Sequence, residues 1–368
     1  MTASWNETTL PTLLLNYKLE NIFNGDEFGL FYQCLPNKTY HLSREKCFGG
    51  KNSKVRLKGI AAESASGEKL PMFGKSKNPR CFKHIKRLPC TYKNQLKSWM
   101  TGDLFTEWVM KLDSFFRAQD RKVALLVDNC SAHPHFEGRS NINLIFPPPN
   151  TTSVLQPMDQ GVIRSLKAHY RHKIGRLCIK AFDNNEPMPK ITILQTMKDL
   201  VSSWNAVSKE TVTNCFKKAG FSKTNKSIEE ADDDHPFKFL TQEFNRLQDL
   251  DPRAVQEDFS AESYIGLDCN VVTTGSLATD AEIITQILDP NFENFEVEDS
   301  DDEAIDVEAP PRPSDIQLEI AFETIQNASQ YSSKYGNEIQ SLALKLEDLM
   351  KMEKMDNLKQ YQITDSEK

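Results

Sequence analysis

The stretch 123-VALLVDNCSAHP-134 runs from five apolar residues directly into an acid, an amide, a thiol and a histidine. A continuous apolar run of this kind predicts a central strand that is covered on both faces of a sheet. Asp128 comes at the carboxyl end of that strand, which is the edge of an open α/β sheet where sites form. The sequence therefore places a candidate functional acid at the end of a buried strand.

Two further acids stand in comparable positions on either side of this strand. Asp26 follows a short apolar run in 21-NIFNGDEFGLFY-32, within a segment, 21–35, that we read as strand, turn and strand. Asp159 opens a helix predicted from about 158 to 182, where a carboxylate gains from the free N–H groups of the first turn. If the first and central strands are neighbours, Asp26 and Asp128 lie side by side.

Three converging carboxylates repel one another, and the repulsion raises at least one pKa unless a cation lies between them. Oxygen ligands without a cysteine or imidazole cluster favour Mg²⁺ or Mn²⁺. Two such ions suit the activation of a water or a 3′-hydroxyl for attack on a phosphodiester.

The remaining patterns predict an α/β unit followed by acidic and helical segments. Strands are expected at 54–64, 69–73 and 143–149, and helices at 103–119, with Asp103 as N-cap, and at 191–206. We expect three regions: 1–222 as the α/β domain, 223–313 as an acidic, largely disordered linker, and 314–361 as an amphipathic helix or a helix pair broken near Gly336. Short helices near 237–249 and 280–288 fit inside the linker.

Charge is divided unevenly along the chain. Residues 1–226 hold 35 Lys and Arg against 18 Asp and Glu, a net of +17, whereas the remainder has a net of −24. This asymmetry suggests a basic surface that faces nucleic acid and an acidic tail. Candidate phosphate-binding side chains gather in one stretch: Lys75, Lys77, Arg80, Lys83, Lys86 and Arg87. Alternatively, these residues form a basic surface that is only solvated and binds no phosphate.

Composition bounds the environment. The eight cysteines form no C-x-x-C pair, which gives no support to a zinc ribbon. No apolar run reaches the roughly 18 residues of a membrane span, and the first residues do not resemble a signal peptide. We expect a protein with reduced thiols and no membrane association.

Three other motifs suggest different kinds of site. The segment 67-GEKLPMFGKS-76 resembles a phosphate-binding loop but has six residues between its glycines, where that loop needs four. Cys130 and His133 suggest a thiol nucleophile without an orienting third group. A metal site of Asp128, His133 and His135 lacks a fourth ligand at a familiar spacing.

Several longer motifs resemble the Tigger and jerky proteins, which derive from pogo-type transposases of the Tc1/mariner superfamily. The resemblance rests on 22-IFNGDEFGLFYQCLPNKTYHL-42, 50-GKNSKVRLKGIAA-62, 74-GKSKNPRCFK-83, 123-VALLVDNCSAHP-134, 147-PPPNTTSVLQPMDQGVIRSLKAHYR-171 and 214-NCFKKAGF-221. It covers residues 1–222. The 30 residues between Asp128 and Asp159 match the spacing of the second and third acids in this family.

The resemblance implies a DDE-type endonuclease domain with an RNase H-like mixed sheet flanked by helices, related to centromere protein B. It implies that Asp26, Asp128 and Asp159 are catalytic and bind Mg²⁺ or Mn²⁺. Asn129 and His133 would shape the metal site, and Asn150 and Gln156 would hold the loop that presents Asp159. DNA as partner, a nuclear location and association with a second copy or with a protein partner through the C-terminal helix are further expectations.

A second hypothesis is a domesticated, non-catalytic DNA-binding or regulatory protein, or a truncated transposase remnant. Family members usually begin with helix-turn-helix modules, whereas this chain begins at the catalytic domain. The first motif usually reads Ala-Asp-Glu-Thr-Gly and is 25-GDEFG-29 here. Relatives also carry two more apolar residues between Phe73 and Gly74, so the strand there is expected to be shortened by about 6.6 Å.

Overall fold

The computed structural model describes residues 5–34, 56–70, 73–76, 80–82, 85–94, 100–148, 151–184, 186, 189–221, 235–250, 260–268, 313–332 and 334–364. The chain divides into two compact units, Met1–Ala309 and Pro310–Lys368. Every helix within the described residues is too short or too polar to span a lipid bilayer.

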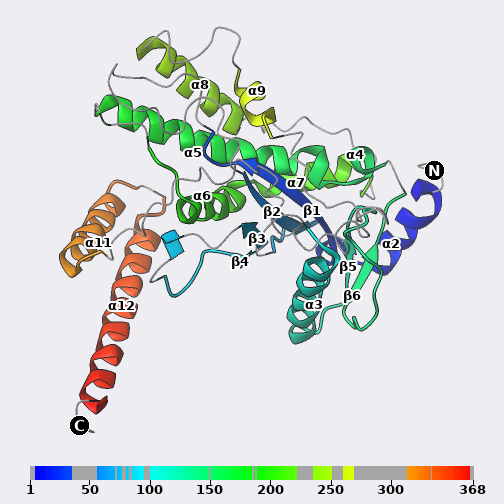
Figure 1. Ribbon diagram of the computed structural model, residues 1–368, viewed down its shortest axis with the longest axis horizontal. Helices are drawn as coiled ribbons and strands as arrows, with labels where there is room; N and C mark the ends of the chain where they lie inside the picture. Colours follow the sequence, from blue (N-terminus) through cyan, green and yellow to red (C-terminus); the bar gives the residue numbers. More distant parts are fainter. Residues whose placement is uncertain are drawn as a thin grey trace, which may run out of the picture. The chain divides into compact units, whose positions relative to one another are not determined.

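The first unit is built on a six-stranded mixed sheet in the order β4-β3-β2-β1-β5-β6 (Figure 1). Strand β1 pairs antiparallel with β2 and parallel with β5, and β5 pairs parallel with β6. This central arrangement confirms the predicted RNase H-like sheet. The strands are β1 (Ile22–Phe31), β2 (Arg56–Ser64), β3 (Phe73–Ser76), β4 (Thr91–Asn94), β5 (Val123–Leu126) and β6 (Ile142–Ile145).

The observed strands agree with most of the predicted ones. β5, β2 and β6 confirm the strands expected at 122–128, 54–64 and 143–149. The prediction of two strands and a turn within 21–35 is wrong, because β1 continues through Asp26 to Phe31. Pairing with β2 from Phe23 to Phe31 holds this segment extended and outweighs the turn preference of Asn, Gly and Asp. Lys69 forms only an isolated bridge with Glu63, and β3 begins at Phe73.

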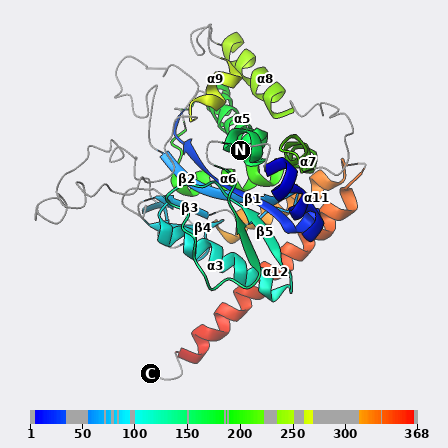
Figure 2. The ribbon, with the colours of Figure 1, turned by 90° about the vertical axis from the view of Figure 1, so that its right-hand side faces the viewer.

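Helices cover both faces of the sheet (Figure 2). Helix α3 (Gly102–Ala118) buries Phe105, Val109 and Phe116 against one face. Helices α5 (Ile163–Asp183), α6 (Ile193–Ala206) and α7 (Lys209–Lys218) bury their apolar residues on the other. The shorter elements are η1 (Trp5–Thr9), α2 (Leu10–Asn16), η2 (Leu19–Asn21), η3 (Arg80–Phe82), α4 (Thr152–Leu155) and η4 (Met158–Val162).

The N-cap of helix α3 comes two residues earlier than predicted. The N-cap is Thr101, whose hydroxyl accepts a hydrogen bond from the N–H of Leu104. Asp103, which was expected in that role, lies in the first turn. There its carboxylate still complements the free N–H groups of the helix end.

Two helices lie inside the range expected as a linker. α8 (His235–Leu250) and α9 (Ala261–Gly266) pack on α5 and form an apolar cluster around Leu240 and Tyr264. The helix expected near 237–249 is therefore confirmed as α8, while the one near 280–288 lies outside the described residues. The predicted domain boundaries at 222 and 313 stay a prediction.

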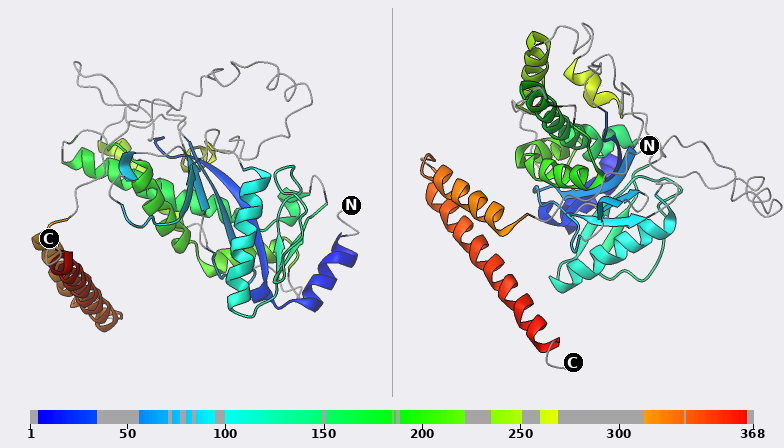
Figure 3. Two further views of the ribbon diagram at one scale, coloured as in Figure 1. Left: turned by 60° about the horizontal axis from the view of Figure 1, so that its bottom comes forward. Right: turned by 60° about the vertical axis from the view of Figure 1, so that its left-hand side comes forward.

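The second unit is a pair of helices, α11 (Asp315–Ser329) and α12 (Gly336–Thr364), which lie side by side (Figure 3). This confirms the helix pair broken near Gly336. Ser314 and Gln317 form a reciprocal capping box at the start of α11. Phe322 and Ala343 are buried, whereas Ile316, Leu342 and Leu349 are exposed.

Candidate active site

Asp26 lies near the middle of β1, the strand at the centre of the sheet. Its backbone partner on β2 is Ala61, and its Oδ1 accepts a hydrogen bond from the N–H of Glu27 at 2.8 Å. The preceding Gly25 faces α3, where a Cβ atom would come within 2.9 Å of the Trp108 ring. A side chain at position 25 would therefore push against the helix that supports this part of the strand.

Asp128 stands two residues beyond the end of β5. The parallel register pairs Ile22 with Ala124 and Asn24 with Leu126. Extending both strands by two residues brings Asp26 and Asp128 level. The predicted adjacency of the two acids thus follows from the observed register.

Asp159 reaches the same place from η4, which is held against the sheet by Asn24. The Asn24 side chain is fully buried. Its Oδ1 accepts a hydrogen bond from the N–H of Met158 at 2.8 Å, and its Nδ2 donates one to the Leu126 carbonyl at 3.2 Å. Asn24 therefore ties together the three segments that carry the acids. Sequence reasoning missed it, although a polar amide inside an apolar strand is a usable signal.

The three acids influence one another electrostatically. Burial raises the pKa of Asp26 well above its usual value, and the negative charges of Asp159, Glu27 and Asp128 raise it further. Desolvation also raises the pKa of Asp159, while its hydrogen bond with Asp26 lowers it and Asp128 raises it. The direction for Asp159 is upward on balance. The side-chain hydrogen bond between the two acids raises the pKa of Asp26 and lowers that of Asp159.

The His133 side chain is almost completely buried between Asp128 and Glu27. Its Nε2 lies 2.7 Å from Glu27 Oε1, and its Nδ1 lies 3.0 Å from the Asp128 carbonyl and 2.6 Å from Asp128 Oδ1. The ring packs on Phe105, with centroids 4.2 Å apart. His133 therefore links two carboxylates on opposite sides of its ring.

The pKa of His133 is raised by these neighbours. Burial alone would lower it, but hydrogen bonds to Asp128, Cys130 and Glu27 and the charge of Glu27 outweigh burial. The protonated ring can donate from both nitrogens. Glu27 was not among the predicted site residues, because an Asp-Glu pair does not reveal which acid has a buried partner.

The other predicted site residues lie in varied positions. Asn129 is exposed, and Asn150 lies outside the described residues. Gln156 is fully buried, and neither of its amide atoms has a hydrogen-bond partner within the described part of the chain. Of the six basic residues, Lys86 and Arg87 are exposed, Lys75 and Arg80 lie in β3 and η3 with undescribed side chains, and Lys77 and Lys83 lie outside the described residues.

The alternative chemistries fare differently. The segment that resembled a phosphate-binding loop leads into strand β3 rather than into a helix, so it lacks the helix N-terminus such a loop needs. The His135 ring packs on Phe146, with centroids 4.2 Å apart. Cys130, Asp128 and His133 bring their ligand atoms within 4.8 Å of one another.

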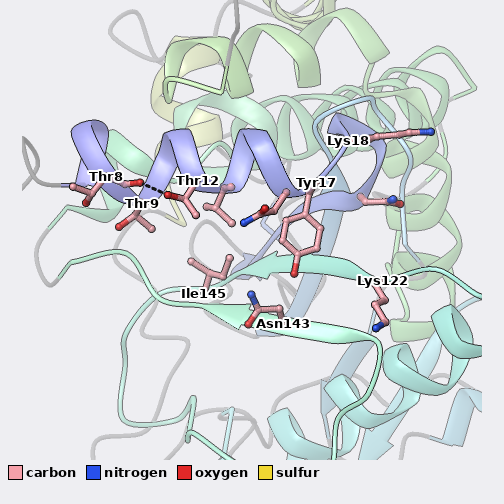
Figure 4. Close-up of a pocket in the computed structure, with 11 residues that line it drawn as sticks. Thr8, Thr9, Thr12, Tyr17, Lys18, Lys122, Asn143 and Ile145 are labelled. Carbon is pink, nitrogen blue, oxygen red and sulfur yellow. Dashed lines mark hydrogen bonds between the residues drawn. The ribbon is translucent and has the colours of Figure 1, made fainter.

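A groove of about 880 Å³ lies between α2 and β6 (Figure 4). Thr8, Thr12, Tyr17, Lys122 and Asn143 are among its lining residues. Its lining contains none of the predicted site residues whose side chains are described. The groove and the acid cluster are therefore separate features of the first unit.

Comparison with known proteins gives a consistent picture. Residues 58–216 match the family of the DDE superfamily endonuclease. That span contains Asp128 and Asp159, while Asp26 precedes it.

Three curated relatives illustrate the similarity. Tigger transposable element-derived protein 4 of Mus musculus is 38% identical over 220 residues, which cover 59% of this chain and 43% of that protein. The Jerky protein homolog of Homo sapiens is 30% identical, covering 54% and 37%, and the major centromere autoantigen B of Homo sapiens is 28% identical, covering 60% and 37%. The chain thus spans less than half the length of these relatives.

Among solved structures, the Mos1 transposase paired-end complex with left transposon end is similar at a TM-score of 0.35 and 13% identity, covering 58% of this chain and 56% of that chain. The family match and the curated relatives together confirm the resemblance seen in the sequence motifs. Residues 58–216 therefore form a DDE superfamily endonuclease domain, and the chain is similar to the transposase-derived Tigger and Jerky proteins.

Proposed function

We propose that this domain is a divalent-metal-dependent DNA endonuclease whose catalytic residues are Asp26, Asp128 and Asp159. The observation that carries the proposal is the meeting of these three carboxylates from β1, from the end of β5 and from η4. Burial raises the pKa of Asp26, and the negative charges of Asp159, Glu27 and Asp128 raise it further. Isolated acids on a solvated surface would not influence one another in this way.

The donor set fits a hard divalent cation. Carboxylate oxygens are the ligands that Mg²⁺ and Mn²⁺ prefer. The raised pKa of Asp26 reflects buried negative charge, which a bound cation would neutralise. When bound, the metal would polarise the phosphodiester and lower the pKa of the attacking water or 3′-hydroxyl.

The chain's own residues hold the acids in fixed positions. Asp26 lies on a strand paired on both edges. Asn24 fixes η4, and therefore Asp159, against the sheet. His133 fixes the backbone and the carboxylate of Asp128. Such rigid placement is what positioning of a reacting phosphate requires.

The substrate would be DNA, bound through its phosphates. The excess of basic residues in 1–226 supports this, because Lys and Arg bind the phosphate backbone without reading sequence. Lys86 and Arg87 are exposed and free to make such contacts in the described structure. A DNA substrate and the relatedness to a centromere autoantigen favour a nuclear location.

A second candidate function is DNA binding or regulation without cleavage. It is favoured by the helix pair α11 and α12, which exposes Ile316, Ile320, Leu342 and Leu349. Exposed apolar residues of this number mark an interaction surface. We propose that this pair associates with a second copy or with a protein partner, whether or not the domain cleaves DNA.

The test is nicking of supercoiled plasmid by the purified chain in Mn²⁺. Asp128→Asn is compared with Glu137→Gln, a matched change at an exposed acid outside the cluster. We expect cleavage by the parent and by Glu137→Gln, and loss of cleavage in Asp128→Asn. Equal cleavage by all three would mean a contaminating nuclease or a different site. No cleavage by a folded parent would favour the non-catalytic function.

A further inference from the structure

A second donor set meets at Asp128, on the side of that residue away from Asp26 and Asp159. Asp128, Cys130 and His133 each bring one ligand atom to within 4.8 Å of the other two. All three lie in the turn that follows β5, within six residues of chain. The turn backbone is held by a hydrogen bond from the His133 N–H to the Cys130 carbonyl at 3.0 Å. The donor atoms therefore converge through local backbone geometry.

His133 is oriented for metal binding by Glu27. Nε2 lies 2.7 Å from Glu27 Oε1, and the Glu27 side chain is only 4% exposed. Nδ1 consequently faces Asp128 and Cys130. Histidines that bind metals almost always donate their other ring N–H to a carboxylate or carbonyl, which fixes the tautomer and the ring orientation. Glu27 supplies that second interaction here.

Asp128 Oδ1 is buried and faces the His133 ring, with Nδ1 2.6 Å away. The Nδ1 hydrogen is aligned with the Asp128 carbonyl, at 3.0 Å, so Oδ1 meets the ring as an ion pair without a well-aligned hydrogen bond. A cation bound to Oδ1 and Nδ1 would replace the ring proton as the positive charge beside this carboxylate.

The ligand types select the metal. A thiolate, an imidazole and a carboxylate suit Zn²⁺, which takes three protein ligands and leaves a fourth position for water. They do not suit Mg²⁺, which prefers oxygen ligands alone. Ligand distances of about 2.0–2.3 Å in a tetrahedral site separate donor atoms by roughly 3.4 Å. Asp128 Oδ1 and His133 Nδ1, which lie 2.6 Å apart, must therefore separate, and this reorients the carboxylate that would hold the catalytic metal.

Binding is balanced in charge and protons. One Zn²⁺ enters, and two protons leave, one from His133 Nδ1 and one from the Cys130 thiol. Burial raises the pKa of this thiol, and the hydrogen bond from His133 lowers it. The carboxylates of Glu27 and Asp128, which hold the proton on the ring, attract a dication more strongly than a single proton.

We propose that Asp128, Cys130 and His133 form a zinc site that competes with the catalytic metal for Asp128, so that Zn²⁺ inhibits the domain. The zinc site itself stands on its own geometry. The inhibition rests on the proposed endonuclease function.

The site is tested with Co²⁺ as a spectroscopic probe for Zn²⁺. We expect the parent chain to bind one Co²⁺ with a thiolate-to-metal absorption band, which added Zn²⁺ removes. Cys130→Ser should lose the band, and Cys90→Ser, at another half-buried cysteine, should keep it. Glu27→Gln should weaken affinity by about 10–100-fold. A parent without the band, or Cys130→Ser with an unchanged band, would overturn the site.

Inhibition is tested separately by titrating Zn²⁺ into the plasmid assay in Mn²⁺, with each variant compared to its own zinc-free rate. We expect the inhibitory Zn²⁺ concentration to rise at least about tenfold in Cys130→Ser, since loss of a direct ligand should exceed the loss of an outer one. An unchanged concentration would overturn the competition. If the parent does not cleave DNA, the endonuclease function fails, while the Co²⁺ measurement still decides the site.

Discussion

Removal of the Asp268 carboxylate should destabilise the first unit more than removal of an exposed carboxylate on the neighbouring helix α9. Asp268 and Arg171 form an ion pair at 2.7 Å, with both side chains fully buried. Asp268 also accepts a hydrogen bond from the Phe31 N–H at 2.6 Å, and Arg171 donates to the Phe31 and Cys34 carbonyls. The pair thus fastens the segment after α9 to the end of β1.

The magnitude follows from what Asp268→Ala leaves behind. The Arg171 guanidinium stays buried without its counter-charge, and breaking a buried pair in this way costs about 3–5 kcal/mol. The Phe31 N–H also loses its acceptor, at a cost of about 1–3 kcal/mol that overlaps with the first. We expect a loss of about 4 kcal/mol in the free energy of unfolding, a large share of the roughly 5–15 kcal/mol typical of proteins.

The assay is urea unfolding of the full chain followed by tryptophan fluorescence. The matched control is Glu262→Ala on α9, whose contact with Arg164 at 3.4 Å is exposed and should be worth less than about 1 kcal/mol. The double variant Arg171→Met with Asp268→Leu should recover part of the loss, because an apolar pair removes the uncompensated charge while the Phe31 N–H still lacks its acceptor. If Asp268→Ala costs no more than Glu262→Ala, the buried pair does not hold this segment and the reasoning fails.

Three further predictions concern the sheet. Burial raises the pKa of Glu63 from 4.5 to about 8. The contribution of protonated Glu63 to the free energy of unfolding is therefore complete below about pH 4.5 and is lost as the pH rises toward 8, by about 1.4 kcal/mol per pH unit. Glu63→Gln should flatten the dependence of this free energy on pH across that window, and an unchanged slope would refute the assignment. Gly25→Ala should cost about 1–3 kcal/mol in thermal unfolding through overpacking, because the new Cβ meets Trp108 at 2.9 Å, and Trp108→Phe should relieve the loss. Asn24→Ala should cost about 1–3 kcal/mol by leaving the Met158 N–H without its acceptor, and it should lower plasmid nicking more than Glu137→Gln does; equal nicking would show that Asn24 does not position Asp159.

Much of the site could be predicted because its parts carry local signals. The apolar run before Asp128 identifies the central strand, and the change from apolar to polar residues at Asp128 marks where the strand ends. Asp159 could be placed at a helix start by the proline before it and the apolar spacing after it. The parallel pairing of β1 and β5 then brings the ends of two predicted elements together.

The parts that could not be predicted depend on contacts between distant residues. Asp268 meets the Phe31 N–H across 237 residues of chain, and an acidic, polar segment gives no local sign of such a partner. The prediction of a turn within 21–35 is wrong for the same reason, since pairing with β2 holds β1 extended through to Phe31. Local preference decides conformation only where tertiary pairing is absent.

The adjacent acids of β1 illustrate how one strand can serve both sides of the site. Successive side chains of a strand point to opposite faces. Asn24 and Asp26 face the side of η4 and α5, whereas Gly25 and Glu27 face α3, as their contacts with Met158 and with Trp108 and His133 show. Asp26 can therefore meet the other acids directly, while Glu27 contacts Asp128 through the His133 ring. The two faces are still coupled, because the negative charge of Glu27 also raises the pKa of Asp26. A change at Glu27 should therefore act on Asp128 through the ring and on Asp26 through the loss of that charge.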